Sequence, residues 1–275
     1  MPTVLITGAS TGIGRACALR LATAGWTVLA GIRGSDAGES LERDAPGGHV
    51  RALTLDVTDP AQIAAAVEQL PAAGLDGLVN NAGIGVGGPI EVIAEEDLRR
   101  QFDVNVFAQL AVTRAMLPAL RRARGRIVFM SSIGGRVALP YTAPYGASKH
   151  AIEAFGDALR IELHSSGVQV ALVEPGSVAT PIWEKGRAEA DRIRIPPELA
   201  AYYRDVPAAI QKALADTASR GVPAEQVAAT VERALTAKRM RARYLVGRDA
   251  QLMLALRRLL PAHLFDRFIR SRMGV

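Results

Sequence analysis

The stretch from Thr3 to Gly14 constrains the fold more than any other part of the chain. The apolar, partly β-branched run Thr3–Thr7 leads directly into the glycine-rich turn Gly8–Gly14, and an apolar, alanine-rich segment then reaches Ala24. This order predicts a strand, a tight turn and a helix that ends at Gly25. Glycines at such a turn let the backbone approach a pyrophosphate at the helix N-terminus. The spacing is G-x-x-x-G-x-G and not the common G-x-G-x-x-G, and a plain strand–helix loop is the alternative.

Apolar runs that suit strands alternate with helical patterns along the rest of the chain. The runs span Trp26–Ile32, Val50–Val57, Asp76–Gly83, Arg126–Ser132, Val168–Val173 and Arg243–Val246, and the long helical patterns span Glu95–Leu120 and Tyr145–Ser166. The alternation predicts an α/β protein with a single-domain Rossmann fold, in which a doubly wound parallel sheet of about seven strands has helices on both faces. A length of 275 residues suits one such domain.

The second long helical pattern carries a phenol and an ammonium one turn apart. Tyr145 and Lys149 are four residues apart, so on a helix they share one face. Because the positive charge favours the phenolate, we expect the pKa of Tyr145 to lie below its ordinary value of about 10. Such a tyrosine exchanges a proton with an alcohol or carbonyl oxygen near neutral pH. Ser132, thirteen residues upstream, is placed to hold that oxygen, and Ser131 competes with it for this role.

These residues together resemble the short-chain dehydrogenase/reductase (SDR) family, and the resemblance covers most of the chain. The motifs that carry it, in the family's order and spacing, are Thr7–Gly14, Asp56-Val57, Asn80–Gly83, Asn105, Ser131-Ser132, Tyr145–Lys149, Pro175-Gly176 and Thr180. The resemblance implies an NAD(P)(H)-dependent oxidoreductase that interconverts an alcohol and a carbonyl by hydride transfer. A catalytically silent NADP-binding sensor or scaffold is the alternative from another class.

The resemblance also implies four catalytic residues. Tyr145 would be the general acid/base, Ser132 would fix the substrate oxygen, and Lys149 would bind the ribose hydroxyls. The backbone of Asn105 would hold a water that links the lysine to a proton relay. A buried, satisfied asparagine is the alternative for Asn105.

Cofactor choice depends on the residue after the second strand. Arg33 stands there, where a carboxylate would favour NAD, and a guanidinium suits the 2′-phosphate of NADP. We therefore expect NADP(H) to be preferred, with NAD as a second cofactor and a solvated loop arginine as the alternative. For Asp56, a helix N-terminal role is the alternative, as it is for Asp59. The residues expected to contact the cofactor are Gly8, Ser10, Thr11, Gly12, Ile13, Gly14, Arg33, Asp56, Val57, Asn81, Ala82, Gly83, Tyr145, Lys149, Pro175, Gly176, Val178 and Thr180.

Two segments should border the substrate pocket, Ile133–Pro144 and a loop at about residues 177–207. Their apolar and aromatic side chains suit a hydrophobic alcohol or ketone, although about half of them could instead pack on the core. The motifs after Ser132 and near Arg243 resemble the hydroxysteroid and retinol dehydrogenase branch, which implies a sterol, retinoid or similar substrate. A 3-oxoacyl thioester is the competing substrate. The expected substrate contacts are Ser132, Gly134, Leu139, Tyr145, Ile182 and Trp183.

The positive charge is concentrated in the C-terminal tail. Residues 236–275 hold ten basic and two acidic side chains, which leaves 23 basic and 25 acidic ones in residues 1–235. This argues against a nucleic-acid partner for the main body. We expect residues 1–248 to form the dinucleotide-binding and catalytic domain and residues 249–275 a basic amphipathic helical extension of it. The extension could dock on the enzyme or a second subunit, or contact a membrane surface peripherally.

The sequence also bears on the cellular location and the oligomeric state of the protein. One cysteine, Cys17, no signal peptide and no long apolar run favour a cytoplasmic protein, with membrane association through the tail as an addition. Four scattered histidines and one cysteine make a catalytic metal unexpected. The resemblance implies a homodimer or homotetramer that pairs through Glu95–Leu120 and Tyr145–Ser166.

Overall fold

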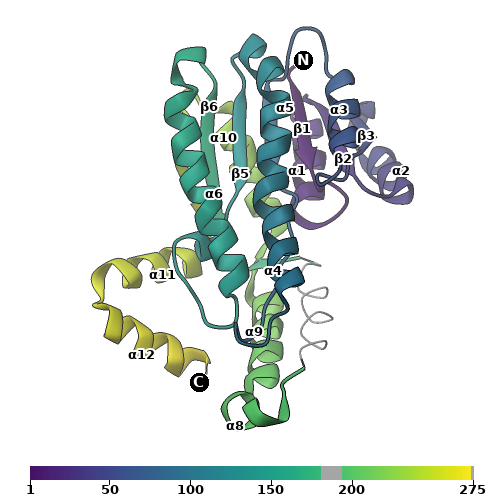
Figure 1. Cartoon of the computed structure of the whole chain (residues 1–275). Helices are drawn as coiled ribbons and strands as arrows, with labels where there is room; N and C mark the ends of the chain where they lie inside the picture. The colour runs from purple at the N-terminus through teal and green to yellow at the C-terminus, as the bar shows by residue number, and fades with distance from the viewer. Residues whose placement is uncertain (181–193, 274–275) are drawn as a thin grey trace.

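The computed structural model describes residues 1–180 and 194–273, and its centre is a sheet of seven parallel strands in the order β3-β2-β1-β4-β5-β6-β9 (Figure 1). The strands are β1 (Thr3–Thr7), β2 (Thr27–Ile32), β3 (Val50–Thr54), β4 (Gly77–Asn80), β5 (Arg126–Met130), β6 (Gln169–Pro175) and β9 (Arg243–Val246). The chain starts in the middle, builds outward to β3 and then returns to add β4 beside β1. Ligands of doubly wound sheets bind at such a reversal. The predicted single-domain Rossmann fold is confirmed.

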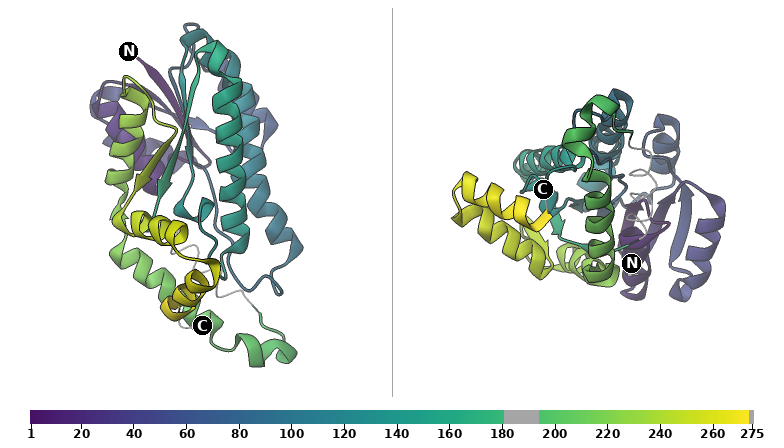
Figure 2. Two further views of the ribbon diagram at one scale, coloured as in Figure 1. Left: turned by 90° about the vertical axis from the view of Figure 1, so that its left-hand side faces the viewer. Right: turned by 90° about the horizontal axis from the view of Figure 1, so that it is seen from below.

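Side chains alternate between the two faces of the sheet, and each face has its own apolar core. Val4 and Ile6 of β1 face one core, and Leu5 faces the other. The first face is covered by α1 (Gly12–Thr23), α2 (Ser35–Asp44) and α10 (Ala224–Thr236), and the second by α3 (Pro60–Glu68), α5 (Ala108–Ala123) and α6 (Ala143–Glu162). Figure 2 shows the sheet between these two layers.

Three predicted strands are too long, and one of them, Asp76–Gly83, is observed as the shorter β4 (Gly77–Asn80). β3 ends at Thr54 and β5 at Met130, so Asp56, Val57 and Ser132 lie in turns after the strands. In both turns, polar side chains bond to the local backbone: the Asp56 carboxylate accepts from Thr58 N, and Ser132 Oγ accepts from Gly134 N. These bonds replace the strand ladder and bring the two side chains to the carboxyl edge of the sheet.

The predicted helix Glu95–Leu120 is continuous but not uniform. It consists of α4 (Glu95–Phe102), a π-helical turn (Asp103–Phe107) and α5, with Pro118 inside α5. The turn contains the buried Asn105. Single π-helical turns within α-helices are frequently found at functional sites.

The remaining elements gather at the carboxyl end of the sheet (Figures 1 and 2). They are the small parallel pair β7 (Val178–Ala179) and β8 (Val222–Pro223), and the helices α8 (Ala200–Tyr203), α9 (Val206–Arg220), α11 (Arg248–Leu259) and α12 (Ala262–Met273). Among the described residues, none of the helices combines the length and apolarity needed to cross a membrane. The carboxyl edge is therefore framed by α9 and the two C-terminal helices.

Candidate active site

The glycine turn between β1 and α1 packs closely against the segment that follows β4. A Cβ on Gly14 would lie 2.3 Å from the carbonyl oxygen of Gly8 and 2.6 Å from Asn81 Nδ2, and a Cβ on Gly8 would lie 2.9 Å from Ala82 Cα. Asn81 Nδ2 donates to the carbonyls of Thr7 and Gly8 at 3.0 and 3.1 Å. Asn81 thus fixes the turn through its carbonyl groups. The first N–H groups of α1 have no partner within the helix. Such a helix start suits the pyrophosphate of a dinucleotide.

The adenosine end expected for the cofactor lies at the ends of β2 and β3. Asp56 accepts from Thr58 N and Thr58 Oγ1 at 2.9 and 2.7 Å, and these bonds, with the positive charge of Arg33, lower the pKa of its carboxyl. Asp59 caps α3 by accepting from the N–H groups of Ala61 and Gln62. Of the two aspartates, Asp59 therefore has the helix-capping role. Arg33 is exposed and forms no salt bridge within the described part of the chain, so its guanidinium is available to a ligand.

Asn105 holds the backbone that follows the Asn80–Gly83 motif. Its Oδ1 accepts from Ile84 N at 2.8 Å, and its Nδ2 donates to Ile84 O at 3.0 Å and to Ser148 Oγ at 3.2 Å. The side chain is therefore buried and satisfied, which was the alternative to a functional role. The two roles of Asn105 do not exclude each other. The hydrogen bonds above belong to its side chain, whereas the relay role would use its backbone.

Two glutamines that the sequence did not single out act on the same segment. Gln101 bonds to Val86 N and Ile84 O, and Gln109 donates to the carbonyl oxygen of Ala82. Both are buried polar residues in a helix that otherwise packs on the sheet. Their position four residues either side of Asn105 was the available signal, because it puts all three amides on one helix face.

Tyr145 and Lys149 lie on the buried side of α6, near the end of β5. Lys149 Nζ donates to the carbonyl oxygen of Met130 at 2.7 Å and lies 5.6 Å from the centre of the Tyr145 ring. Burial lowers the pKa of Lys149 to about 8, against the opposing effect of the Glu153 carboxylate. The ammonium is therefore held one helical turn from the phenol in an apolar setting.

The expected lowering of the Tyr145 pKa is wrong for this structure. Burial raises the pKa of the phenol above its ordinary value, and a hydrogen bond with Ser132 only partly opposes this shift. The sequence argument considered the nearby charge and left out desolvation, which disfavours a buried phenolate. The side chain is consequently better suited to donate a proton than to exist as a free phenolate.

The two adjacent serines have different surroundings. Ser132 Oγ accepts from Gly134 N at 3.0 Å, donates to Pro175 O at 3.4 Å and bonds to Tyr145. Ser131 instead faces Glu153, and its buried Oγ forms no hydrogen bond by distance and angle with the described residues. Of the two, the structure brings Ser132 to the tyrosine.

Some of the remaining predicted cofactor and substrate contacts lie near Tyr145, and others do not. Gly134 and Gly85 flank the Tyr145 ring, since a Cβ on either would lie 3.4 or 3.9 Å from it. Pro175 is the last residue of β6, and Gly176, Val178 and Thr180 follow it at the same edge. Leu139 packs instead against the cluster of Val137, Phe265 and Ile269, which includes the C-terminal helices. Ile182 and Trp183 lie outside the described residues.

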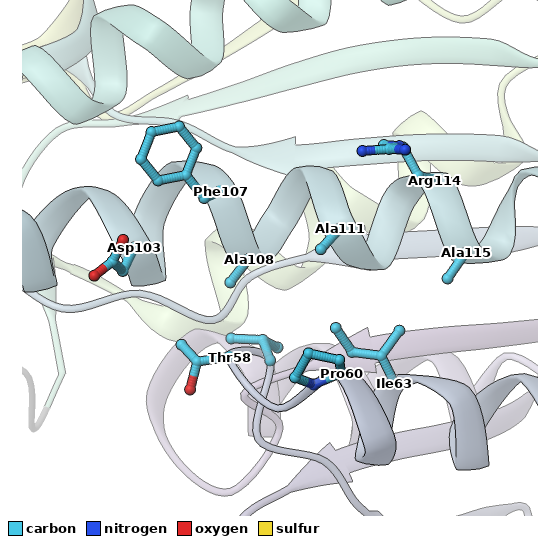
Figure 3. A pocket seen from close by; sticks show the side chains of 10 residues that line it. Thr58, Pro60, Ile63, Asp103, Phe107, Ala108, Ala111, Arg114 and Ala115 are labelled. Carbon is cyan, nitrogen blue, oxygen red and sulfur yellow. The ribbon is translucent and has the colours of Figure 1, made fainter.

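A separate groove of about 720 Å³ lies on the outer face, between α5 and the start of α3 (Figure 3). Figure 3 shows Ala108 and Ala115 turned toward Pro60 and Ile63, whereas Phe107 points away from them. The groove is lined by helix side chains and by Val57 and Thr58 of the turn before α3, and it lacks the serine, tyrosine and lysine described above. Within residues 1–180 and 194–273, no group of three or more His, Cys, Asp or Glu could hold a metal ion.

Comparison with known proteins agrees with this fold and this grouping of residues. The family model described as short chain dehydrogenase matches residues 2–191. The chain is 34% identical over 272 residues to an NADPH-dependent 3-dehydrocapnine reductase of Ornithobacterium rhinotracheale, covering 96% of this chain and 94% of that protein. It is 36% identical over 280 residues to retinol dehydrogenase 5 of Mus musculus, covering 96% and 86%. A solved short chain dehydrogenase/reductase of Burkholderia phymatum in complex with NAD superposes with a TM-score of 0.79 at 26% identity, covering 94% and 92%.

The fold and the glycine turn define a doubly wound protein of the dinucleotide-binding class. The length and identity of the matches go further: the chain belongs to the short-chain dehydrogenase family of oxidoreductases.

Proposed function

We propose that this protein is an NADP(H)-preferring oxidoreductase that interconverts an alcohol and a carbonyl on a lipophilic substrate, with Tyr145 as general acid/base. The observation that carries the proposal is the meeting of three side chains at the carboxyl edge of the sheet. Tyr145 bonds to Ser132, and Lys149 lies buried beside the ring. The glycine turn and Arg33 lie along the same edge, so reaction and cofactor binding have adjacent places.

Each side chain has a task that follows from its surroundings. Tyr145, kept protonated by burial, donates its proton to the carbonyl oxygen during reduction and accepts it back during oxidation. Ser132 holds the same oxygen and stabilises the negative charge that develops on it. Lys149 binds the ribose hydroxyls and provides positive charge beside the phenol. The nicotinamide supplies the hydride when bound.

The cofactor proposal rests on Arg33 and on the relatives. Arg33 is exposed at the end of β2, where a guanidinium binds a 2′-phosphate with two hydrogen bonds. One relative is an NADPH-dependent reductase, and one solved structure is in complex with NAD. We therefore assign NADP(H) as the preferred cofactor and NAD as a weaker alternative.

The substrate proposal rests on the space beside Tyr145 and the apolar walls around it. Gly85 and Gly134 leave room at the ring, and Tyr141 and Tyr203 pack with the buried Val206 and Ile210 of α9. A relative at 36% identity is a retinol dehydrogenase. A retinoid, sterol or similar lipophilic alcohol or ketone fits such a site better than a small polar one.

The test is NADPH oxidation, and NADP⁺ reduction, against a panel of retinoids, steroids, simple ketones and 3-oxoacyl thioesters. We expect turnover with retinoid or steroid members, and a loss of at least about 1000-fold in kcat for Tyr145→Phe, because the proton donor is removed. NADPH binding, followed by fluorescence titration, should persist in that variant.

Other outcomes of the same panel decide between the alternatives. Preferential turnover of the thioesters would identify a 3-oxoacyl thioester, and not a lipophilic alcohol or ketone, as the substrate. NADPH binding without turnover of any member would favour the silent sensor. Undiminished turnover by Tyr145→Phe would overturn the assignment of the proton donor.

The proposal includes two surfaces. The π-helical turn before α5 exposes Phe107 at 59%, and α6 exposes Phe155 and Ile161 at 39% and 69%. We assign these side chains to the interface of a homodimer or homotetramer. The α11–α12 pair exposes Leu252, Leu259 and Leu264 beside several arginines, and we assign this face to peripheral contact with anionic membranes.

A further inference from the structure

A buried cluster of charged side chains lies directly behind Lys149. It joins four segments: Glu153 on α6, Glu174 on β6, Arg243 on β9 and Arg136 after β5. Arg243 Nε lies 3.0 Å from Glu153 Oε2 and 3.1 Å from Glu174 Oε1, and Arg136 Nη1 lies 2.9 Å from Glu174 Oε1. The carboxylate side chains of Glu153 and Glu174 are only 7% and 2% exposed. We call these four residues the Glu153 cluster.

The carboxylate of Glu153 is only partly neutralised within this cluster. Arg243 is shared among three carboxylates, because its Nη2 also donates to Asp157 at 2.6 Å. Arg136 is directed to Glu174. The second oxygen of Glu153, Oε1, is buried, and the group beside this carboxylate, apart from the arginine, is the neutral hydroxyl of Ser131. The negative charge of Glu153 therefore remains available to a further cation.

Lys149 is that cation, because it lies one helical turn before Glu153 on the same face of α6. Both pack on the turn after β5: a Cβ on Gly135 would lie 3.0 Å from Lys149 O and 3.1 Å from Glu153 Cγ. The ionised carboxylate raises the pKa of Lys149, against burial, which lowers it. Among the charged groups of the described residues, Glu153 is the one that shifts the pKa of Lys149.

The other elements around the pair contribute few charges of their own. The charged side chains that face Glu153 are Asp157 on α6, Arg136 after β5, Glu174 on β6 and Arg243 on β9, and Tyr145 is the titratable group beside Lys149. From the π-helical turn, the neutral Asn105 bonds to Ser148 of α6. Glu153 is thus the carboxylate whose charge raises the pKa of the lysine.

We propose that Glu153 is a positioning residue of the active site, whose buried carboxylate keeps the ammonium of Lys149 charged where it must support Tyr145. This inference rests on the proposed function for its catalytic consequence, but the effect on the lysine exists whether or not the protein is an enzyme. Burial raises the pKa of Glu153 to about 7, and Arg243 opposes this shift and holds the carboxylate in place. The strand that supplies Arg243 is the last of the sheet, so the C-terminal part of the chain contributes to the chemistry of a helix far from it in sequence.

The experiment follows Lys149 directly by nuclear magnetic resonance of protein labelled with ¹³C-lysine. The chain holds four lysines, so the Cε signal of Lys149 can be assigned by its absence in Lys149→Met. We expect Glu153→Gln to lower the titration midpoint of Lys149 by about one pH unit, since an adjacent opposite charge is lost. Glu153→Asp, which keeps the charge, should restore most of the shift.

Asp157→Asn is the matched control, because Asp157 also binds Arg243 from α6 but lies a further turn from Lys149. A purely structural role predicts lower thermal stability in both variants and no movement of the Lys149 midpoint. An unmoved midpoint in folded Glu153→Gln would overturn the proposal.

Two further readouts keep the test decisive. If Glu153→Gln does not fold, the wild-type Cε curve decides, because ionisation of Glu153 should add a second inflection to the titration of Lys149. A single inflection would refute the inference. If the panel yields a carbonyl substrate, the loss of turnover at alkaline pH should begin about one pH unit lower in Glu153→Gln. Absence of any turnover by the wild type would count against the proposed function and leave the lysine result standing.

Discussion

Arg33 is the residue on which cofactor choice depends. Its guanidinium is exposed at the end of β2 and bound to no carboxylate among the described residues. Hydrogen bonds to a charged group contribute about 1.5–3 kcal/mol, which corresponds to roughly 10- to 150-fold in affinity. We expect Arg33→Ala to weaken NADPH binding within this range and to leave NADH binding nearly unchanged.

Fluorescence titration with both cofactors measures this difference. Arg15→Ala is a useful control, because Arg15 is also a basic residue near the glycine turn but is paired with Asp44. Equal losses for NADPH and NADH in Arg33→Ala would contradict the assigned contact.

Lys149 makes the stability of the protein depend on pH in a defined direction. Burial lowers its pKa from 10.5 to about 8, so the folded state binds the proton less well than the unfolded state. The cost of burying the charge is fully present below pH 8 and disappears as pH rises toward 10.5. Relative to Lys149→Met, the free energy of unfolding of the wild type should therefore rise by about 3 kcal/mol over this interval.

Urea denaturation of both proteins from pH 7 to pH 10 tests this expectation. Parallel stability curves for the two proteins would show that the lysine titrates alike in the folded and unfolded states.

Residue types and spacings were enough to predict which side chains meet, but not how they titrate. The four-residue spacing of Tyr145 and Lys149 correctly predicted a shared helix face, because helix geometry alone determines it. The direction of the Tyr145 shift was wrong, because burial of the phenol depends on how α6 packs on β6 and on the turn Ile133–Gly135. Glu153 carried a usable signal, a carboxylate one turn beyond the lysine, but its burial depends on Arg243, ninety residues away.

At the level of helices and strands, apolar pattern predicted all seven strands of the main sheet and misjudged their ends. The apolar pattern shows which residues can be buried, but a strand ends where the backbone forms other hydrogen bonds. Such bonds run from Thr58 N to Asp56 and from Gly134 N to Ser132. The π-helical turn was equally hidden, because it arises from contacts of Asn105 with Ile84 and not from a local preference. Neither α9 nor the short pair β7–β8 was predicted.

The α11–α12 pair leads to a prediction about membranes. Its inner side docks Phe265 and Ile269 on Val137, and its outer side exposes Leu252 at 59% and Leu259 at 79%. We expect the protein to co-sediment with vesicles of phosphatidylserine and phosphatidylcholine at low salt and to be released at high salt.

The double variant Leu252→Glu, Leu259→Glu should lose this binding, and Ile161→Glu on α6 should retain it. Failure of the wild type to co-sediment at low salt would remove the proposed contact.

At the scale of the whole molecule, the proposed assembly rests on exposed apolar side chains of α6 and of the turn before α5. Phe155 and Ile161 lie on the outer side of α6, and Phe107 lies beside it at the start of α5. Burial of such side chains stabilises an interface by about 25 cal/mol per Å² of apolar surface. We expect light scattering after size exclusion to give the mass of a dimer or tetramer.

Ile161→Glu should shift the mass toward the monomer, whereas Leu259→Glu on α11 should not. A monomeric wild type at micromolar concentration would contradict the proposed interface.

Arg243 also has a consequence for how the protein is made. A ribosome releases this residue only after Glu153 and Glu174 have been synthesised, and until then one of the two guanidiniums that these carboxylates share in the finished protein is missing. Leaving a buried charge without its partner costs about 3–5 kcal/mol. The region around Lys149 and Glu153 should therefore not fold stably before Arg243 has been synthesised. A truncated chain that ends before residue 243 should be degraded by proteases faster than the full chain.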